Sequence, residues 1–446
     1  MRSQLFFLIT VLSLSFGYSQ EQTYSFTLEE AIQYALENNY AAINAERDIL
    51  DAQKQKWETI AGGLPQINGA VSYQNQLKQP VSVIPAEIFG GEPGTFAEVV
   101  FGQPQTAAAT ATLTQQIFDG SYIVGVQATK AFLSYSANNK EKTELDVRKQ
   151  VVEAYGNVLL AEESVEILEK NKITLEKNLF ETTKLYENGL GEEEDVDQLQ
   201  ITLSSIDNQL NNAIRLREIT LQMLNLNMGL DLTAPTQLQE NLEDLTLSKI
   251  DLGILNTAFN LSDNVDFKLA ENLNQQRYYE WKLARSRALP TLNAFVNYGS
   301  SAFSDNFDFF SSDQQWFDSS ILGFDLSIPI FSSLKRSAST QRAKIALEKA
   351  KTQLTEAEQQ IRLQLENAKN NYTLAIANYE TAKQNLTLSE RIENKNQIKY
   401  KEGLATSFEL RQAQTQLYAT QQEYLQSMVE VINKKTELEI ILNTKA

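Results

Sequence analysis

Two very long segments without proline constrain this chain more than any other feature of its sequence. They run from Gly120 to Glu187 and from Ser333 to Lys401, about seventy residues each. Because an α-helix rises about 1.5 Å per residue, each segment would form a helix on the order of 100 Å long. That length exceeds the diameter of a small globular domain. The chain is therefore expected to be built from extended helices that pack side by side.

Both long segments carry a regular apolar stripe, which we call the seam. Its positions step alternately by four and three residues, which is the seven-residue repeat of a coiled coil. In the first segment the seam consists of Val147, Val151, Ala154, Val158, Ala161, Val165 and Leu168. It returns 214 positions later as Ile361, Leu365, Ala368, Tyr372, Ala375, Tyr379 and Ala382. A stripe of this kind packs helices together far more often than it binds a ligand, so it predicts architecture rather than a site.

The rest of the chain is duplicated in the same order. Leu64-Pro65-Gln66-Ile67-Asn68 recurs as Leu289-Pro290-Thr291-Leu292-Asn293, and Tyr186-Glu187-Asn188-Gly189-Leu190 recurs as Tyr400-Lys401-Glu402-Gly403-Leu404. Such repeats predict repeated structure. We expect a first structural repeat over residues 20–230, a linker over 231–251 and a second repeat over 252–446. Each repeat reads as helix, strand, loop, strand, long helix, turn and helix.

Shorter helices are predicted beside the long ones. Their expected ranges are 28–61, 194–228, 252–287 and 406–443. Two helices of about thirty-five residues laid end to end equal one of about seventy. The predicted packing is therefore a cylinder of paired helices, in which each long helix lies against two short ones.

Four segments alternate between apolar and polar residues instead of following a helical period. Their apolar positions are Ile67, Val71 and Tyr73; Ala109, Ala111, Leu113 and Ile117; Leu292, Ala294, Val296 and Tyr298; and Leu322, Phe324, Leu326, Ile328 and Ile330. One such segment alone suits a half-buried soluble sheet better. Four copies at matching positions of an exported chain favour a transmembrane β-barrel. Because bacterial barrels start at eight strands, several chains would have to share one.

The N-terminus predicts export. Met1-Arg2 precedes an apolar run from Leu5 to Phe16 and the small-residue exit Gly17-Tyr18-Ser19, so residues 1–19 are expected to be a cleaved signal peptide. The alternative, a buried helix, fits a run at this position poorly. No other apolar run approaches about twenty residues, so membrane insertion would require a barrel.

Composition excludes several classes of function. The chain has no Cys and no His, so disulfides, a lipidated N-terminal Cys, imidazole metal ligands and a Ser-His-Asp triad are impossible. Its net charge of −18 argues against nucleic-acid binding. No phosphate-binding loop or metal set is visible, and carboxylate pairs occur at the density expected by chance on solvated helices. We therefore predict no enzyme, no cofactor and no metal.

Taken together, these residues resemble the TolC family of outer membrane efflux proteins. The resemblance rests on the region from Leu28 to Asn39, on Leu64-Pro65-Gln66, on Gln115-Gln116-Ile117-Phe118-Asp119, on Ala154-Tyr155 with Val158-Leu159, and on both Tyr-x-x-Gly-Leu turns. It implies a homotrimer with four transmembrane strands per chain, a twelve-stranded barrel in outer-membrane lipid, and an α-barrel tunnel in the periplasm. It also implies a periplasmic adaptor (membrane fusion) protein and an inner-membrane transporter as partners. The implied function is the exit duct of a tripartite efflux pump or a type I secretion system.

The resemblance also implies where the duct closes, namely at the two turns that follow the long helices. The residues carried over to a periplasmic gate are Tyr186, Gly189 and Asp195 in the first half, and Tyr400, Gly403 and Glu409 in the second. The first turn adds an acidic run, Glu192, Glu193, Glu194, Asp195 and Asp197. Such a run is usually a solvated turn or a favourable helix N-terminus, but repeated round a pore it would favour cations. Ala405 and Gln412 depart from the arginine and the second acid of some members.

One rival interpretation stays open at this stage. A periplasmic helical scaffold or adaptor without a pore would explain the signal peptide and the helices, but it gives the four alternating segments no purpose. The sequence identifies neither the cargo nor the pump, because a passive duct takes its specificity from the transporter it serves.

Overall fold

The computed structural model describes residues 24–444, so the predicted signal peptide, residues 1–19, lies outside the described range. The described chain is mainly helical, with a smaller part in strands. It forms two compact units. We call them the sheet unit, Leu50–Tyr135 with Asn272–Thr352, and the hairpin unit, Ser136–Glu271 with the described parts of Met1–Ile49 and Gln353–Ala446. Units and predicted repeats are different divisions of the chain, because each unit takes segments from both repeats.

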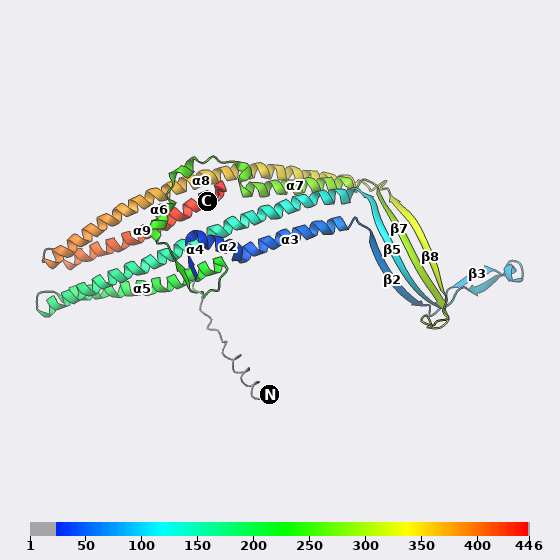
Figure 1. Ribbon diagram of the computed structural model, residues 1–446, viewed down its shortest axis with the longest axis horizontal. Helices are drawn as coiled ribbons and strands as arrows, with labels where there is room; N and C mark the ends of the chain where they lie inside the picture. The colour runs from blue at the N-terminus through cyan, green and yellow to red at the C-terminus, as the bar shows by residue number, and fades with distance from the viewer. Residues whose placement is uncertain (1–23, 445–446) are drawn as a thin grey trace, which may run out of the picture. The chain divides into compact units, whose positions relative to one another are not determined.

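The sheet unit contains one antiparallel four-stranded sheet with the order β2-β5-β7-β8 (Figure 1). The strands are β2 (Gln66–Asn75), β5 (Gln105–Asp119), β7 (Thr291–Ser304) and β8 (Trp316–Ser327). Three of the four alternating segments lie within these strands, and the fourth begins inside β8 but extends past its end to Ile328 and Ile330. Within residues 24–444, neither β2 nor β8 pairs with another strand along its outer edge.

The register gives the sheet one largely apolar row on one face. Ile67 lies opposite Leu113, Leu113 opposite Val296, and Val296 opposite Leu322. Because side chains alternate along a strand, the neighbouring row lies on the opposite face. That row contains Thr112, whose hydroxyl accepts a hydrogen bond from the Asn297 amide at 2.7 Å. The sheet therefore has an exposed apolar row on one side and hydrogen-bonded polar side chains on the other.

The connection between β2 and β5, expected as a loop, contains a β-hairpin of its own. It is formed by β3 (Val81–Pro85) and β4 (Phe96–Val100), with a short 3₁₀ helix, η1 (Ala86–Phe89), between them. The β7–β8 connection is aromatic and contains Phe307, Phe309 and Phe310. Its Phe309 is only 5% exposed and packs with Ala107 and Ala302.

The long helices form as predicted. They are α4 (Gly120–Glu187) and α8 (Lys335–Lys401). Helix α8 begins two residues later than predicted, because Ser333 and Leu334 have φ of 47° and 64°, outside the helical region. Every seam residue in both helices is buried. The interpretation of the seam as packing is confirmed.

Two of the four shorter helices differ from the prediction. The expected helix over 28–61 is broken at Asn39 into α2 (Leu28–Asn38) and α3 (Tyr40–Ala61). The Asn39 amide donates to the carbonyl of Asn227 at 2.7 Å, and its oxygen accepts from the N–H of Ala41 at 2.7 Å, so a contact distant in sequence stabilises the break. The expected helix over 252–287 begins only at α7 (Val265–Ser286).

Polar capping residues explain the late start of α7. Two 3₁₀ turns precede it, η2 (Leu252–Asn256) and η3 (Leu261–Asp263). Asp251 caps the first by accepting from the N–H of Gly253, and Asn260 caps the second by accepting from the N–H of Ser262. The other short helices, α5 (Glu193–Met228) and α9 (Ser407–Leu442), match the prediction within one residue.

The predicted linker over 231–251 is ordered and packed in the hairpin unit. Its strand β6 (Thr236–Leu238) pairs in parallel with β1 (Tyr24–Phe26), and its helix α6 (Leu242–Lys249) contacts α9. Two buried tyrosines hold it, the seam residue Tyr372 and Tyr155, which follows the seam residue Ala154. The hydroxyl of Tyr372 donates to the carbonyl of Lys249 at 2.7 Å, and that of Tyr155 donates to the Glu240 carboxylate at 3.1 Å.

Candidate functional site

The two predicted turns join α4 to α5 and α8 to α9, and they have the same backbone geometry. Gly189 and Gly403 are left-handed, with φ of 74° and 73°. The N–H of Gly189 donates to the carbonyl of Tyr186 at 2.8 Å, and that of Gly403 donates to the carbonyl of Tyr400 at 3.0 Å. Glycine is favoured at such a helix end because a side chain is strained at positive φ. The repeated Tyr-x-x-Gly-Leu motif therefore stops both long helices.

The second turn leads into a fully capped helix. The hydroxyl of Thr406 accepts from the N–H of Glu409 at 3.2 Å, and the Glu409 carboxylate accepts from the N–H of Thr406 at 2.8 Å. This reciprocal pair is a capping box. The hydrogen bonds from Thr406 hold the pKa of Glu409 below its usual value. Glu409, predicted as a gate acid, is thus also one of the two residues of the capping box at the start of α9.

The first turn leads into a helix start of different chemistry. Glu192 is the N-cap of α5 and makes no capping hydrogen bond with its side chain. Acids in a first helical turn are stabilised by the helix dipole, as the sequence indicated. Within residues 24–444, no lysine or arginine forms an ion pair with any acid of the run, Glu192, Glu193, Glu194, Asp195 and Asp197. Glu192, Glu193 and Asp197 are also exposed, so this turn carries dense, uncompensated negative charge.

Two hydrogen bonds join the turns of one chain to each other. The hydroxyls of Thr182 and Tyr400 lie 3.0 Å apart, which connects the end of α4 to the end of α8. The hydroxyl of Ser407 donates to the Asp195 carboxylate, which connects the starts of α9 and α5. Of the residues predicted from sequence, the structure therefore brings Tyr400 and Asp195 into contact with the opposite hairpin. Tyr186 is 41% exposed instead.

Sequence reasoning missed the polar residues that line α4 near its turn. Asn171, Asn178 and Thr182 are buried on the part of α4 beyond Leu168. The Asn171 amide donates to the side-chain oxygen of Gln421 at 2.9 Å. The Asn178 amide nitrogen finds no acceptor in the described part of the chain. The sequence signal is partial, because four-and-three stepping beyond Leu168 leads to Lys172, Leu175, Leu179 and Thr182, so Thr182 alone of the three lies on it.

No helix of residues 24–444 has an apolar stretch that could cross a membrane. In the same range, no three acidic, histidine or cysteine side chains gather in a way that could hold a metal ion.

The family of the chain follows from its match to known proteins. Residues 31–230 and 260–444 match the family of outer membrane efflux proteins. The chain belongs to this family. It is therefore an outer-membrane channel-tunnel of the efflux type, with its helical part in the periplasm. Comparison with functionally curated proteins gives no significant match.

Solved structures share the fold of this efflux protein at low sequence identity. The outer membrane protein VceC of Vibrio cholerae has 16% identity and a TM-score of 0.71, with 93% of this chain and 95% of VceC covered. The CmeC outer membrane channel of Campylobacter jejuni has 17% identity and a TM-score of 0.72, with coverage of 93% and 85%. The open state of the MtrE channel of Neisseria gonorrhoeae has 18% identity and a TM-score of 0.68, with coverage of 93% and 88%.

The contacts between the hairpins of this efflux protein are of a reversible kind. At the turns they are single hydrogen bonds between side chains and a 3.9 Å ion pair between Lys401 and Glu181, and water can replace either partner in each. Such a bond contributes a net stabilisation of only about 0.5–1.5 kcal/mol. At the turns the two hairpins can therefore separate without breaking an apolar core, whereas farther along α4 packs with α9 in a shared core that contains Tyr155 and Val429.

Proposed function

We propose that three copies of this chain assemble into one duct, with a twelve-stranded barrel in the outer membrane and an α-barrel tunnel in the periplasm. The observation that carries this proposal is the sheet, which has two open edges and an exposed apolar row. An open edge leaves backbone donors and acceptors unpaired, which lipid does not tolerate. Pairing the β8 edge of one chain with the β2 edge of the next satisfies both edges and closes a ring.

The sheet face that carries the apolar row gives the proposed barrel its outer surface. Val71 and Ile67 are 87% and 72% exposed, and Leu322 is 68% exposed. These side chains would face lipid, and the polar row through Thr112 and Asn297 would face the lumen, as in barrels that alternate in this way. A periplasmic scaffold without a pore would leave the apolar row in water. The channel is for this reason preferred to the scaffold.

The partners proposed for the duct are a periplasmic adaptor protein and an inner-membrane transporter. The duct itself would be passive, and it would carry small molecules or a secreted protein chosen by the transporter. This part of the proposal rests on family membership. The sequence has no Cys, no His and only four Met, so a dedicated soft-metal site on this chain is not expected.

The gate is proposed at the two turns. Its residues are Tyr186, Gly189, Glu192, Glu193, Glu194, Asp195, Asp197, Tyr400, Gly403 and Glu409. The proposal is supported by the hydrogen bonds that join the turns within one chain. Three copies of the acidic run round one axis would repel one another and favour cations. A docking partner would open the gate by binding the separated hairpins better than the closed ones.

The experiment that tests the duct combines mass and conductance. The purified full-length protein in detergent should have the mass of a trimer, and it should form discrete ion channels in a planar lipid bilayer. A folded monomer that leaves the bilayer non-conducting would exclude the duct. A folded trimer without conductance would favour the scaffold.

A further inference from the structure

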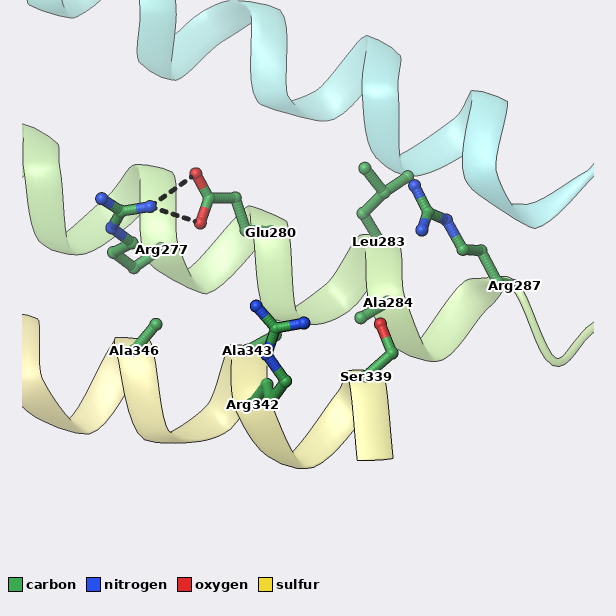
Figure 2. A pocket seen from close by; sticks show the side chains of 9 residues that line it. All are labelled: Arg277, Glu280, Leu283, Ala284, Arg287, Ser339, Arg342, Ala343 and Ala346. Atoms are coloured by element: carbon green, nitrogen blue, oxygen red, sulfur yellow. Dashed lines mark hydrogen bonds and ion pairs between the residues drawn. The ribbon is translucent and has the colours of Figure 1, made fainter. Parts of the chain in front are cut away.

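A pocket between α7 and α8 in the sheet unit has no role in the proposed duct. Its volume is about 400 Å³, and both helices line it (Figure 2). Its polar lining includes Arg277, Glu280 and Arg287 on the α7 side, and Ser339 and Arg342 on α8. Three guanidinium groups on one pocket are unusual in a chain whose net charge is −18.

Only one of these arginines is neutralised by a carboxylate. The Arg277 guanidinium donates to both Glu280 carboxylate oxygens, at 3.0 and 2.7 Å, as the dashed lines in Figure 2 show. Within residues 24–444, neither Arg287 nor Arg342 forms an ion pair. Like charges that share a pocket repel one another unless an anion lies between them. The pocket therefore has an electrostatic reason to hold an anion.

The donors on the pocket match a phosphate group better than a simple halide. A guanidinium presents several N–H donors in one plane and binds phosphate oxygens in pairs. The Ser339 hydroxyl offers one more donor or acceptor at the same pocket. Four lining residues, Leu283, Ala284, Ala343 and Ala346, are apolar, so part of the wall could contact hydrocarbon.

The position of the pocket indicates where that phosphate group would come from. Arg287 lies four positions before β7, which begins at Thr291. If the sheet spans the membrane, as the proposed function requires, Arg287 lies at the level of the lipid headgroups. The adjoining turn of α7 is of the interfacial kind, with the Lys282 ammonium 4.8 Å from the Tyr278 ring and the Arg285 guanidinium 4.9 Å from the Trp281 ring.

We propose that this pocket binds a phosphate group, held by Arg287 and Arg342 with Arg277 beside them. The phosphate belongs to an anionic lipid of the inner leaflet or to a soluble phosphate anion. This inference rests on the proposed function only for the position of the pocket near the membrane. That three arginines line this pocket, two of them without an ion pair in the described part of the chain, is observed independently of it.

The test is a calorimetric titration of the full-length protein in detergent. The probes are short-chain phosphatidylglycerol, short-chain phosphatidylcholine and inorganic phosphate. The double variant Arg287→Gln/Arg342→Gln removes the pocket charges. The control Lys335→Gln/Lys349→Gln also removes two positive charges, both exposed on α8 and outside the pocket. We expect saturable binding of phosphatidylglycerol that weakens at least tenfold in the arginine variant and less than twofold in the control.

The remaining outcomes separate the two sources and can overturn the site. Binding of inorganic phosphate without phosphatidylglycerol, lost in the arginine variant, assigns the pocket to a soluble anion. Equal losses in both variants, or equal affinity for the anionic lipid and phosphatidylcholine in all proteins, would show diffuse attraction and overturn the pocket. Bilayer conductance is recorded in parallel. Normal channels without anion binding contradict this inference alone, whereas absent channels in the native protein contradict the duct.

Discussion

The chain has two helical hairpins, the first formed by α4 and α5 and the second by α8 and α9. Their turns have the same backbone geometry, but the helix that follows each turn begins differently. Both turns place a glycine at φ near 73–74° and close with the same backbone hydrogen bonds. After the first turn, Glu192 caps α5 without a side-chain hydrogen bond, and four more acids follow. After the second, Thr406 and Glu409 form a complete capping box. The two copies therefore have the same turn backbone but different side chains at the start of the following helix.

We infer from this difference that the two hairpins have different roles in a gate. In the second hairpin the capping box holds the start of α9. This hairpin also contacts the first through the hydroxyls of Tyr400 and Ser407. The first hairpin accepts those contacts and carries the exposed charge. If the turns form the gate, ion selectivity should depend mainly on the first hairpin, while the strength of closure should depend on contacts made by the second.

The largest expected effect comes from removing the charge of the first hairpin. A variant with Glu192, Glu193 and Glu194 changed to Gln, and Asp195 and Asp197 changed to Asn, should lose most of its preference for cations. The reason is that charged rings set selectivity at a narrow mouth. Reversal potentials measured in a salt gradient across a planar bilayer give the cation-to-anion ratio.

Glu409→Gln is the matched comparison for that variant. Because Glu409 is engaged in the capping box, its replacement should change selectivity far less. If both variants keep the native ratio, the acids are solvated turn residues and the selective constriction lies elsewhere. If Glu409→Gln has the larger effect, the assignment of tasks to the two hairpins is reversed.

The next prediction concerns the left-handed glycine that both turns contain. Gly189→Ala and Gly403→Ala should each destabilise the protein by about 1–2 kcal/mol, because a side chain is strained in the left-handed conformation. Denaturant unfolding at a fixed protein concentration measures this loss. Gly156→Ala in the interior of α4 is the control, since its new methyl group would lie 3.7 Å from Val429, an ordinary contact. Clearly unequal losses at the two turns would mean that the turns are not equivalent.

The features predictable from the sequence are those fixed by local periodicity and by glycine. The seam predicted α4 and its burial because packing repeats every seven residues along one helix. The break at Asn39 was missed because the Asn227 carbonyl, 188 positions away, stabilises it. The late start of α7 was missed although Asp251 and Asn260, both good caps, precede it.

The same division holds at the candidate site. Gly189 and Gly403 could be predicted because only their backbone conformation matters. The role of Glu409 as a cap was visible in the spacing from Thr406 but was not used. The contact between Thr182 and Tyr400 joins residues 218 positions apart, and no local pattern of either helix predicts it. Charge and turn type are thus encoded locally, whereas the closing contacts depend on how the hairpins pack.

A smaller effect is expected from the closing hydroxyl of the second hairpin. Tyr400→Phe removes the hydrogen bond to Thr182 and should weaken closure by about 0.5–1.5 kcal/mol. Single-channel recordings should then show longer or more frequent openings. Tyr40→Phe is the control, because Tyr40 is exposed and lies outside the proposed gate, so its change should leave the openings unchanged. Equal behaviour of the two variants would remove the hydroxyl contact from the gate.

The smallest effect concerns a half-buried acid on the second hairpin, and it depends on pH. Burial raises the pKa of Glu393, so the folded protein binds its proton more tightly than the unfolded chain does. The resulting contribution to stability is fully present below the unfolded pKa of about 4.3, and it is lost as the pH rises through the raised folded pKa. At neutral pH the ionised carboxylate therefore weakens the second hairpin.

Glu393→Gln should remove this weakness, because the amide stays neutral at every pH. The variant should melt at a higher temperature than the native protein at pH 7.5 and at nearly the same temperature at pH 4, as measured by thermal unfolding at equal protein concentration. Glu390→Gln, an exposed position on the same helix, should show no such divergence. If the native protein and Glu393→Gln keep a constant difference across this pH range, the ionisation of Glu393 does not limit the stability of the hairpin, and the two hairpins differ only at their turns.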